Sequence, residues 1–140
     1  MKQASITTRM LDTSEDWKDW IGIVQSMAQS TTGIDIWPYI NPLSKVPPLR
    51  PSKPVRPHYS EYNPEATTLG ELTAAQKESY KDACHIYEKD ELPEYNEYAK
   101  NMNAITQHIF DSVSARNIAC ILDKPTPYGK LVALKERLAP

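Results

Sequence analysis

The neighbouring residues Cys84 and His85 are the first candidates for chemistry, because a thiol beside an imidazole can form a nucleophilic dyad. They lie in a stretch with helical periodicity, and adjacent side chains on a helix point about 100° apart. We therefore interpret Cys84 as a thiol without a catalytic base. The second cysteine, Cys120, completes no redox or zinc spacing, so both cysteines are expected to be free thiols.

A crowd of carboxylates follows the first cysteine and is the only candidate for cation binding. It has neither the glycine nor the alternating oxygen ligands of a calcium loop. We interpret it as a solvated helix face, and we take its first three members as a candidate assembly surface. The carboxylates are Glu88, Asp90, Glu91 and Glu94.

No nucleotide-binding, metalloprotease or serine-hydrolase motif is present. The remaining histidines, His58 and His108, are isolated in the sequence, and His108 is expected at the surface. The sequence therefore predicts no catalytic, metal-binding or cofactor-binding residues. It favours a protein that is not an enzyme and has no small-molecule substrate.

The charge is unevenly placed, although the net charge is only -2. Residues 43–60 carry basic side chains and no acid, whereas residues 71–97 are strongly acidic. A basic, flexible stretch is a candidate contact for the phosphates of RNA. The candidate RNA-binding residues are Lys45, Arg50, Lys53 and Arg56.

Prolines recur through residues 42–64, about every third position between 48 and 57, as in a polyproline II strand. We favour a stiff spacer, which we call the tether. A ligand for an aromatic groove and an arm for RNA remain the alternatives. Tyr59 and Tyr62 are expected to pin this segment onto the helical body with their hydroxyls in water, although stacking on RNA bases is also open.

A first helix is predicted from a cap at Thr13 or Ser14 to Gln29, with turn residues after it. Its apolar residues recur at helical spacing at Trp17, Trp20, Ile21, Val24, Met27 and Ala28. Residues 34–40 are too short for an independent helix and must dock on something. The predicted core anchors are Trp17, Trp20, Ile21 and Trp37, the first three packing on the 95–113 helix beside Leu131 and Leu134.

Further helices follow the tether. Thr73 and Gln76 form a capping-box pattern for a helix whose buried face includes Tyr80 and Tyr87. The dipeptide at 92–93 should interrupt it, and a long helix should follow over 93–113. A shorter helix is expected to carry Ile118, Ile121 and Leu122, and a last one to start at Pro127 after the Thr126 cap with Leu131, Leu134 and Leu138 on one face.

The predicted fold is all-α, with five or six helices in a bundle and the long proline-rich tether. An arm over residues 1–13 should precede a single helical domain over 14–140 that includes the tether at 42–64. A chain of 140 residues suits one domain. No apolar run is long enough to span a membrane, and the start of the sequence does not resemble a signal peptide. A cytoplasmic or nucleoplasmic location is expected.

The order of four pieces resembles the N-terminal part of Gag polyproteins of fungal Copia-type LTR retrotransposons, the Pseudoviridae. The pieces are Leu11 with Trp17-Lys18-Asp19-Trp20, then Ile36-Trp37-Pro38-Tyr39-Ile40-Asn41-Pro42, the tether, and the closing run from Thr126-Pro127-Tyr128-Gly129 to Pro140. The resemblance covers nearly the whole chain, but a second helical lobe and a CCHC zinc knuckle are not in this sequence.

The resemblance implies the first helical lobe of a capsid protein. Such a domain self-associates weakly and repeatedly into a virus-like particle that encloses RNA, so its expected partners are further copies of itself and RNA. The alternative is a domesticated Gag relic that acts as a helical protein-interaction module of the host.

Overall fold

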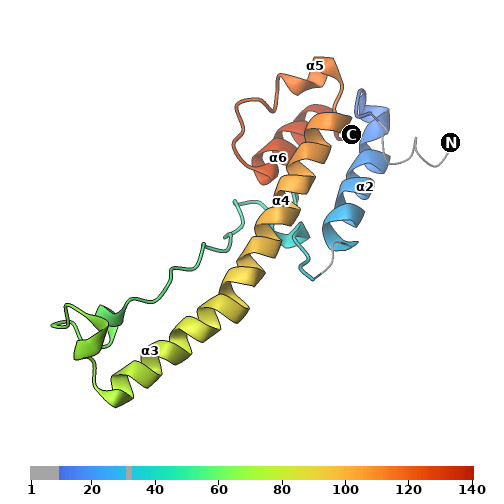
Figure 1. Cartoon of the computed structure of the whole chain (residues 1–140). Helices are drawn as coiled ribbons and strands as arrows, with labels where there is room; N and C mark the ends of the chain where they lie inside the picture. Colours follow the sequence, from blue (N-terminus) through green and yellow to red (C-terminus); the bar gives the residue numbers. More distant parts are fainter. Residues whose placement is uncertain (1–9, 31–32) are drawn as a thin grey trace. The chain divides into compact units, whose positions relative to one another are not determined.

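The computed structural model describes residues 10–30 and 33–140, and its chain divides into two compact units. The first unit comprises residues 1–50 and 98–140, and the second comprises residues 51–97. The all-α prediction is confirmed, since the described residues form helices and one isolated bridge (Figure 1). The sequence analysis predicted one domain over 14–140, and within that range the contacts gather in these two units.

The first unit contains α2 (Trp17–Ser30), most of α4 (Leu92–Ser112), α5 (Ala115–Ile118) and α6 (Pro127–Leu138). Short 3-10 turns precede α2 and follow it, at η1 (Ser14–Asp16) and η2 (Trp37–Tyr39). The helical period of the apolar residues places one face of each of these helices inward. The core residues are Leu11, Trp17, Trp20, Val24, Ala28, Ile36, Trp37, Ile40, Tyr98, Met102, Ile105, Ile109, Val113, Ile121, Leu131, Leu134 and Leu138.

Trp20 joins α2 to the end of α4. Its side chain is only 1% exposed, and its indole Nε1 donates a hydrogen bond of 2.9 Å to Ser112 Oγ. The Trp17 ring lies 5.9 Å from the Trp20 ring, measured between centroids. Three of the four predicted anchors, Trp17, Trp20 and Trp37, are therefore buried. The fourth, Ile21, is only half-buried, because it lies at the edge of the helical stripe.

Part of the predicted N-terminal arm belongs to the folded unit. Leu11 is fully buried and forms a parallel bridge with Val113. Its N–H donates to Ser112 O at 2.7 Å, and its carbonyl accepts from Ser114 N at 3.0 Å. Residues 1–9 of the predicted arm lie outside the described residues.

The segment at 34–40 docks as expected. Ile36 and Ile40 are fully buried, and the Ile36 N–H donates to Ala28 O at 3.3 Å. The Asp35 carboxylate accepts from Trp37 N at 2.9 Å, which starts η2. Before it, Gly33 has a φ of 92°, a conformation that favours glycine and reverses the chain after α2.

The first residues of the closing run, Thr126 to Gly129, form the start of α6. Thr126 Oγ1 accepts from Gly129 N at 3.0 Å and caps α6. A Cβ at Gly129 would lie 3.3 Å from that same oxygen, so glycine permits the tight cap. Pro127 occupies the first turn, where its missing N–H costs nothing. The Tyr128 hydroxyl donates to Ser44 O at 2.6 Å and holds the start of the tether.

The predicted short helix before the closing run ends earlier than expected. The helix α5 covers only Ala115–Ile118 and is followed by turns. Ile121 is fully buried, but Leu122 is 64% exposed. The predicted helix therefore does not extend to these two residues, and only one of them is buried.

The second unit consists of an extended stretch, the 3-10 turns η3 (Tyr59–Glu61) and η4 (Leu69–Glu71), and the helix α3 (Ala74–Ile86). The capping box at the start of α3 is confirmed: Thr73 accepts from Gln76 N at 3.1 Å, and Gln76 Oε1 accepts from Thr73 N at 2.9 Å. Two apolar residues of the segment before α3, Ala66 and Leu72, are buried.

The expected interruption at 92–93 is wrong. Helical hydrogen bonding passes from α3 through a π-helical turn, η5 (Tyr87–Glu91), into α4. A proline inside an α-helix lacks a donor and clashes with the preceding turn. The wider π turn, in which Leu92 N donates to Tyr87 O, lies directly before Pro93 and accommodates it.

Replacing Trp20 by alanine should lower the free energy of unfolding by about 3–5 kcal/mol, because a fully enclosed ring is lost from the core. Chemical denaturation followed by far-ultraviolet circular dichroism measures this. Ile21→Ala, on the same helix but half-buried, is the matched control and should cost clearly less. Equal losses in the two variants would contradict the packing described above.

Candidate interaction surfaces

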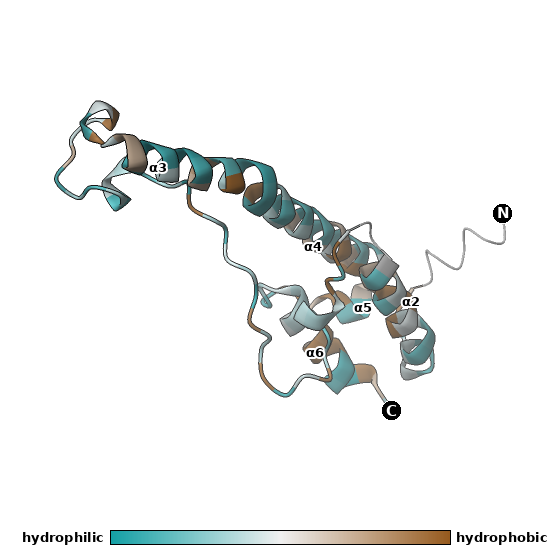
Figure 2. Ribbon diagram, turned by 90° about the horizontal axis from the view of Figure 1, so that it is seen from below, coloured by the Kyte–Doolittle hydropathy of each residue, from teal (hydrophilic) through white to brown (hydrophobic). Residues whose placement is uncertain are grey.

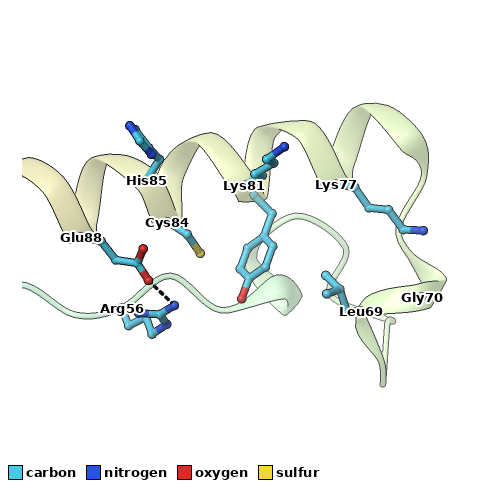
Figure 3. A pocket seen from close by; sticks show the side chains of 9 residues that line it. Arg56, Leu69, Gly70, Lys77, Lys81, Cys84, His85 and Glu88 are labelled. Atoms are coloured by element: carbon cyan, nitrogen blue, oxygen red, sulfur yellow. Dashed lines mark hydrogen bonds and ion pairs between the residues drawn. The ribbon is translucent and has the colours of Figure 1, made fainter.

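The second unit has an open groove of about 750 Å³ beside α3, which we call the α3 groove. The extended stretch, η4, α3 and η5 each contribute to its wall. In Figure 3 Arg56, Cys84 and Glu88 lie between the helix and the extended stretch, whereas His85 and Lys81 point away from that stretch. The groove is lined by Arg56, Leu69, Gly70, Lys77, Tyr80, Lys81, Cys84, His85 and Glu88.

Helical spacing explains why basic side chains gather here. Lys77, Lys81 and His85 follow one another at four-residue intervals along α3, and such residues share a face. Both lysines are exposed, and neither forms an ion pair within residues 10–30 and 33–140. The groove therefore carries two uncompensated positive charges.

Arg56 and Glu88 close one end of the α3 groove. The guanidinium Nη2 donates to Glu88 Oε2 at 2.6 Å, and the guanidinium carbon lies 5.7 Å from the centroid of the Tyr87 ring. The hydrogen bond to Glu88, followed by the carboxylate's charge, raises the pKa of Arg56 above its ordinary value. Arg56 is thus permanently charged and already paired within its own chain.

The other predicted RNA-binding residues are divided between the units. Lys45 and Arg50 belong to the first unit, and Lys53 to the second; all three are exposed. The predicted basic set is thus not confined to one unit. Their contact with RNA stays a prediction, whereas Arg56 is already occupied by Glu88.

The candidate assembly surface is exposed, as a solvated face requires. Glu88, Asp90 and Glu91 all lie in the π turn and face solvent. They differ in one respect, because Glu88 holds Arg56 while no ion pair joins Asp90 or Glu91 to another residue of the described ranges. Their role in assembly stays a prediction.

The thiol of Cys84 forms a hydrogen bond with the hydroxyl of Tyr80. A hydrogen bond with Cys84, followed by burial, raises the pKa of Tyr80. Figure 3 shows Cys84 and His85 pointing in different directions, as their positions on the helix require. The geometry therefore provides no base for Cys84.

Tyrosines pin the extended stretch, in agreement with the interpretation from the sequence. The Tyr62 ring meets the Tyr80 ring edge-on, with 6.0 Å between centroids. The Tyr59 hydroxyl was expected to remain in water, but it donates to Thr67 O at 2.8 Å. Tyr59 thus closes the loop that precedes η4.

The first unit has an open hollow of about 680 Å³ beside α6. Cys120 lies in its wall with Tyr128 and Arg137. Burial raises the pKa of the Cys120 thiol, so the thiol stays protonated and unreactive at neutral pH. This hollow has no feature that singles out a ligand.

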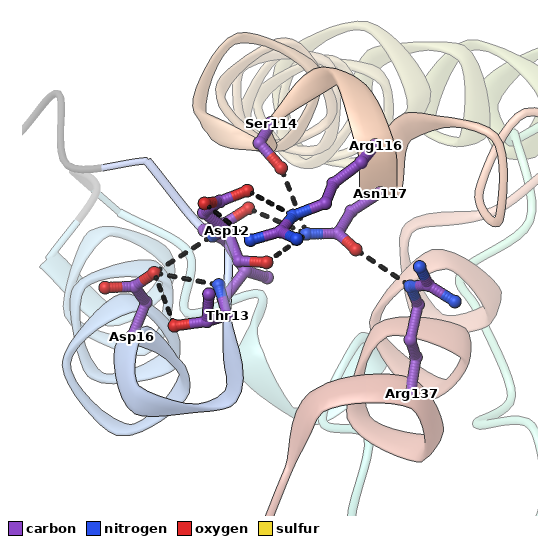
Figure 4. Close-up of polar contacts among 8 residues, drawn as sticks. Asp12, Thr13, Asp16, Ser114, Arg116, Asn117 and Arg137 are labelled. Atoms are coloured by element: carbon purple, nitrogen blue, oxygen red, sulfur yellow. Dashed lines mark hydrogen bonds and ion pairs between the residues drawn. The ribbon is translucent and has the colours of Figure 1, made fainter.

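A polar clamp in the first unit was not predicted from the sequence (Figure 4). Asn117 is 1% exposed, and its Nδ2 lies 3.2 Å from Leu11 O, 2.8 Å from Asp12 O and 3.0 Å from Ser114 Oγ. Its Oδ1 accepts from Arg137 Nε at 2.8 Å. One side chain therefore ties the N-terminal segment, the start of α5 and the end of α6 together.

An exposed ion pair accompanies the clamp. Arg116 binds Asp12 through two hydrogen bonds, Nε to Oδ1 at 2.8 Å and Nη2 to Oδ2 at 2.9 Å. The hydrogen bond from Arg116, followed by one involving Ser114, lowers the pKa of the Asp12 carboxyl. The pair orients the segment before η1, but its exposure limits its contribution to stability.

Two further polar side chains are enclosed in the first unit: Lys130, which the sequence analysis did not single out, and in part His108. Lys130 is only 5% exposed; its ammonium group donates to the carbonyls of Ile121 and Lys124 and lies 5.0 Å from the centroid of the Phe110 ring. Its position between Pro127 and Leu134 on the buried stripe of α6 was the available signal. His108, expected at the surface, is half-buried, and its Nε2 has no hydrogen-bond partner in the described structure; burial lowers its pKa.

Within the described ranges, no three histidines, cysteines or carboxylates lie together as a metal site would require. None of the helices described is both long and apolar enough to cross a bilayer. Comparison of the chain with models of protein families, with curated proteins and with solved structures found no match. The case for a function therefore depends on the sequence pattern and on the surfaces described above.

Replacing Asn117 by alanine should lower the free energy of unfolding by about 2–4 kcal/mol, because it removes the donor of two backbone carbonyls in a buried site. Arg116→Gln, which breaks the exposed pair next to it, should cost much less. Thermal and urea denaturation of both variants provide the comparison. If Asn117→Ala melts like the parent, the N-terminal segment is not held by this side chain.

Proposed function

We propose that this chain is a Gag-like capsid domain of a Copia-type retrotransposon, which self-associates into a particle that encloses RNA. The observation that carries the proposal is the place of the pieces on which the resemblance rests. All of them except the tether contribute to the core of the first unit, through Leu11, Trp20, Ile36, Ile40 and Leu131. The pattern therefore coincides with the residues that build one helical lobe.

Exposed apolar side chains give a second line of support. Leu43, Val46 and Leu49 are 71%, 68% and 94% exposed and recur at every third residue in the first unit. Brown positions mark hydrophobic residues along the extended trace in Figure 2. Single exposed apolar residues are ordinary, but three of them close together in the chain offer apolar surface that another copy can cover.

A capsid domain performs no chemistry, and its work is repeated weak contact. Head-to-tail contacts that close under rotation produce rings, and many small interfaces add up to a stable shell. Charge steers such contacts more than it strengthens them. Arg56 is paired within its own chain. The tether cations that remain to contact Asp90 and Glu91 of a neighbouring copy are therefore Lys45, Arg50 and Lys53.

One observation favours the alternative, a domesticated Gag relic that serves the host as a protein-interaction module. Residues 47–57 have no helical or strand assignment, and Leu49 and Val55 are 94% and 84% exposed between the prolines. An exposed polyproline stretch with apolar side chains suits an aromatic groove on a partner protein. Such a module would bind one partner and would remain a monomer by itself.

Sedimentation velocity over a wide range of protein concentrations tests the proposal. The parent chain should be a monomer at micromolar concentration and form larger species towards millimolar concentration, because shell contacts are individually weak. The double reversal Asp90→Lys and Glu91→Lys should shift this association while leaving the melting temperature nearly unchanged, since both residues lie on a solvated face.

The control is the double reversal Asp123→Lys and Glu136→Lys, which changes the net charge equally at exposed positions of the first unit. It should leave the association closer to that of the parent. A chain that stays monomeric at every concentration would reject the capsid proposal and favour the interaction module.

A further inference from the structure

We propose that the α3 groove binds the phosphate backbone of single-stranded RNA. The inference deepens the proposed function, because it assigns the RNA contact to α3 and not to the tether alone. It depends on Lys77 and Lys81, whereas the test of self-association changes Asp90 and Glu91. The two can therefore fail separately.

The charge of α3 is sorted by face, which the overall acidity of residues 71–97 conceals. Lys77 and Lys81 line the groove, whereas Glu78 and Asp82, each one residue further along, do not. Residues four apart rise about 6 Å along a helix axis. Lys77 and Lys81 therefore lie about one turn apart along α3, where each can meet a different phosphate of one strand.

The groove also has the right form for a flexible polyanion. Its volume of about 750 Å³ falls within the usual range of ligand sites, and it is open to solvent along α3 (Figure 3). A single strand can bend into such a hollow, whereas a stiff duplex would touch only its rim. Leu69 and Tyr80 supply apolar wall against which a base can rest.

Glu88 limits the positive charge of the groove. It occupies the end of the wall and takes Arg56 as its partner at 2.6 Å. Removing the carboxylate would leave the guanidinium beside the groove and free to meet a further phosphate. Replacing Glu88 is therefore expected to strengthen RNA binding, whereas replacing the groove lysines is expected to weaken it.

The test is fluorescence anisotropy with a short fluorescein-labelled oligouridylate and the full chain at concentrations where it is a monomer. The variant Lys77→Gln/Lys81→Gln should lose affinity by about 25-fold at about 0.1 M salt and flatten the log–log salt slope by about 1.4, since each single-strand phosphate contact contributes about 0.7. Glu88→Gln should instead bind more tightly, about fivefold, and steepen the slope by about 0.7.

The matched control is Lys89→Gln/Lys100→Gln, which removes the same charge from exposed helical positions outside the groove. It should change affinity far less than the groove variant. Circular dichroism melts of all variants establish that they are folded. Equal losses in the two double variants would overturn the proposal, and so would weaker binding by Glu88→Gln.

Competition with an oligoglutamate of equal charge identifies the class of ligand. Displacement of RNA only at much higher peptide concentration supports a site for nucleic acid. Displacement at equal concentration would overturn the RNA assignment and leave a general polyanion site. If RNA binds as predicted but sedimentation shows no self-association, the groove stands and the capsid proposal fails.

Discussion

The pairing of Leu11 with the backbone that follows α4 is the interaction on which the first unit most depends. It joins a short N-terminal segment to Ser112 and Ser114 through two backbone hydrogen bonds and buries the leucine completely. Because Ser112 also accepts the Trp20 indole, this one corner fixes both the entry of the chain and the position of α2. Asn117 also donates to the carbonyls of Leu11 and Asp12 at this corner.

The second unit has few buried apolar residues, and its surface chemistry is determined by which side chains share a helix face. Lysines on one face of α3 and acids on the next give a helix that is neutral in total and basic along its groove. Arg56 lies on Tyr87 and is held by Glu88, so the basic stretch is partly neutralised in its own chain. Net charge over a stretch is therefore a poor guide to what such a surface binds.

Local and periodic signals in the sequence predicted much of the fold. The Thr73–Gln76 capping box follows from residues close in the chain, and the burial of Trp20 follows from a long helical stripe. The prediction that the helix breaks at Pro93 was wrong. A proline breaks a helix when the preceding backbone stays α-helical, but here a π turn accommodates it. Lys130 was overlooked because its burial depends on carbonyls that a separate turn presents to it.

The surfaces were harder to predict for the same reason. The tether's cations formed one set in the sequence, yet Lys45 and Lys53 belong to different units, and Arg56 is paired with Glu88, an acid distant in the chain. The corner at Leu11 likewise depends on residues about a hundred positions away. No periodicity reports a contact of that kind, so sequence patterns locate elements better than they locate binding sites.

The central claim is that this chain encloses RNA in a self-assembled particle. Electron microscopy of the concentrated full chain mixed with single-stranded RNA, before and after ribonuclease treatment, tests it most directly. The account predicts closed particles that persist through the treatment and still contain RNA when they are opened. Open aggregates or isolated chains, with all of the RNA digested, would contradict it.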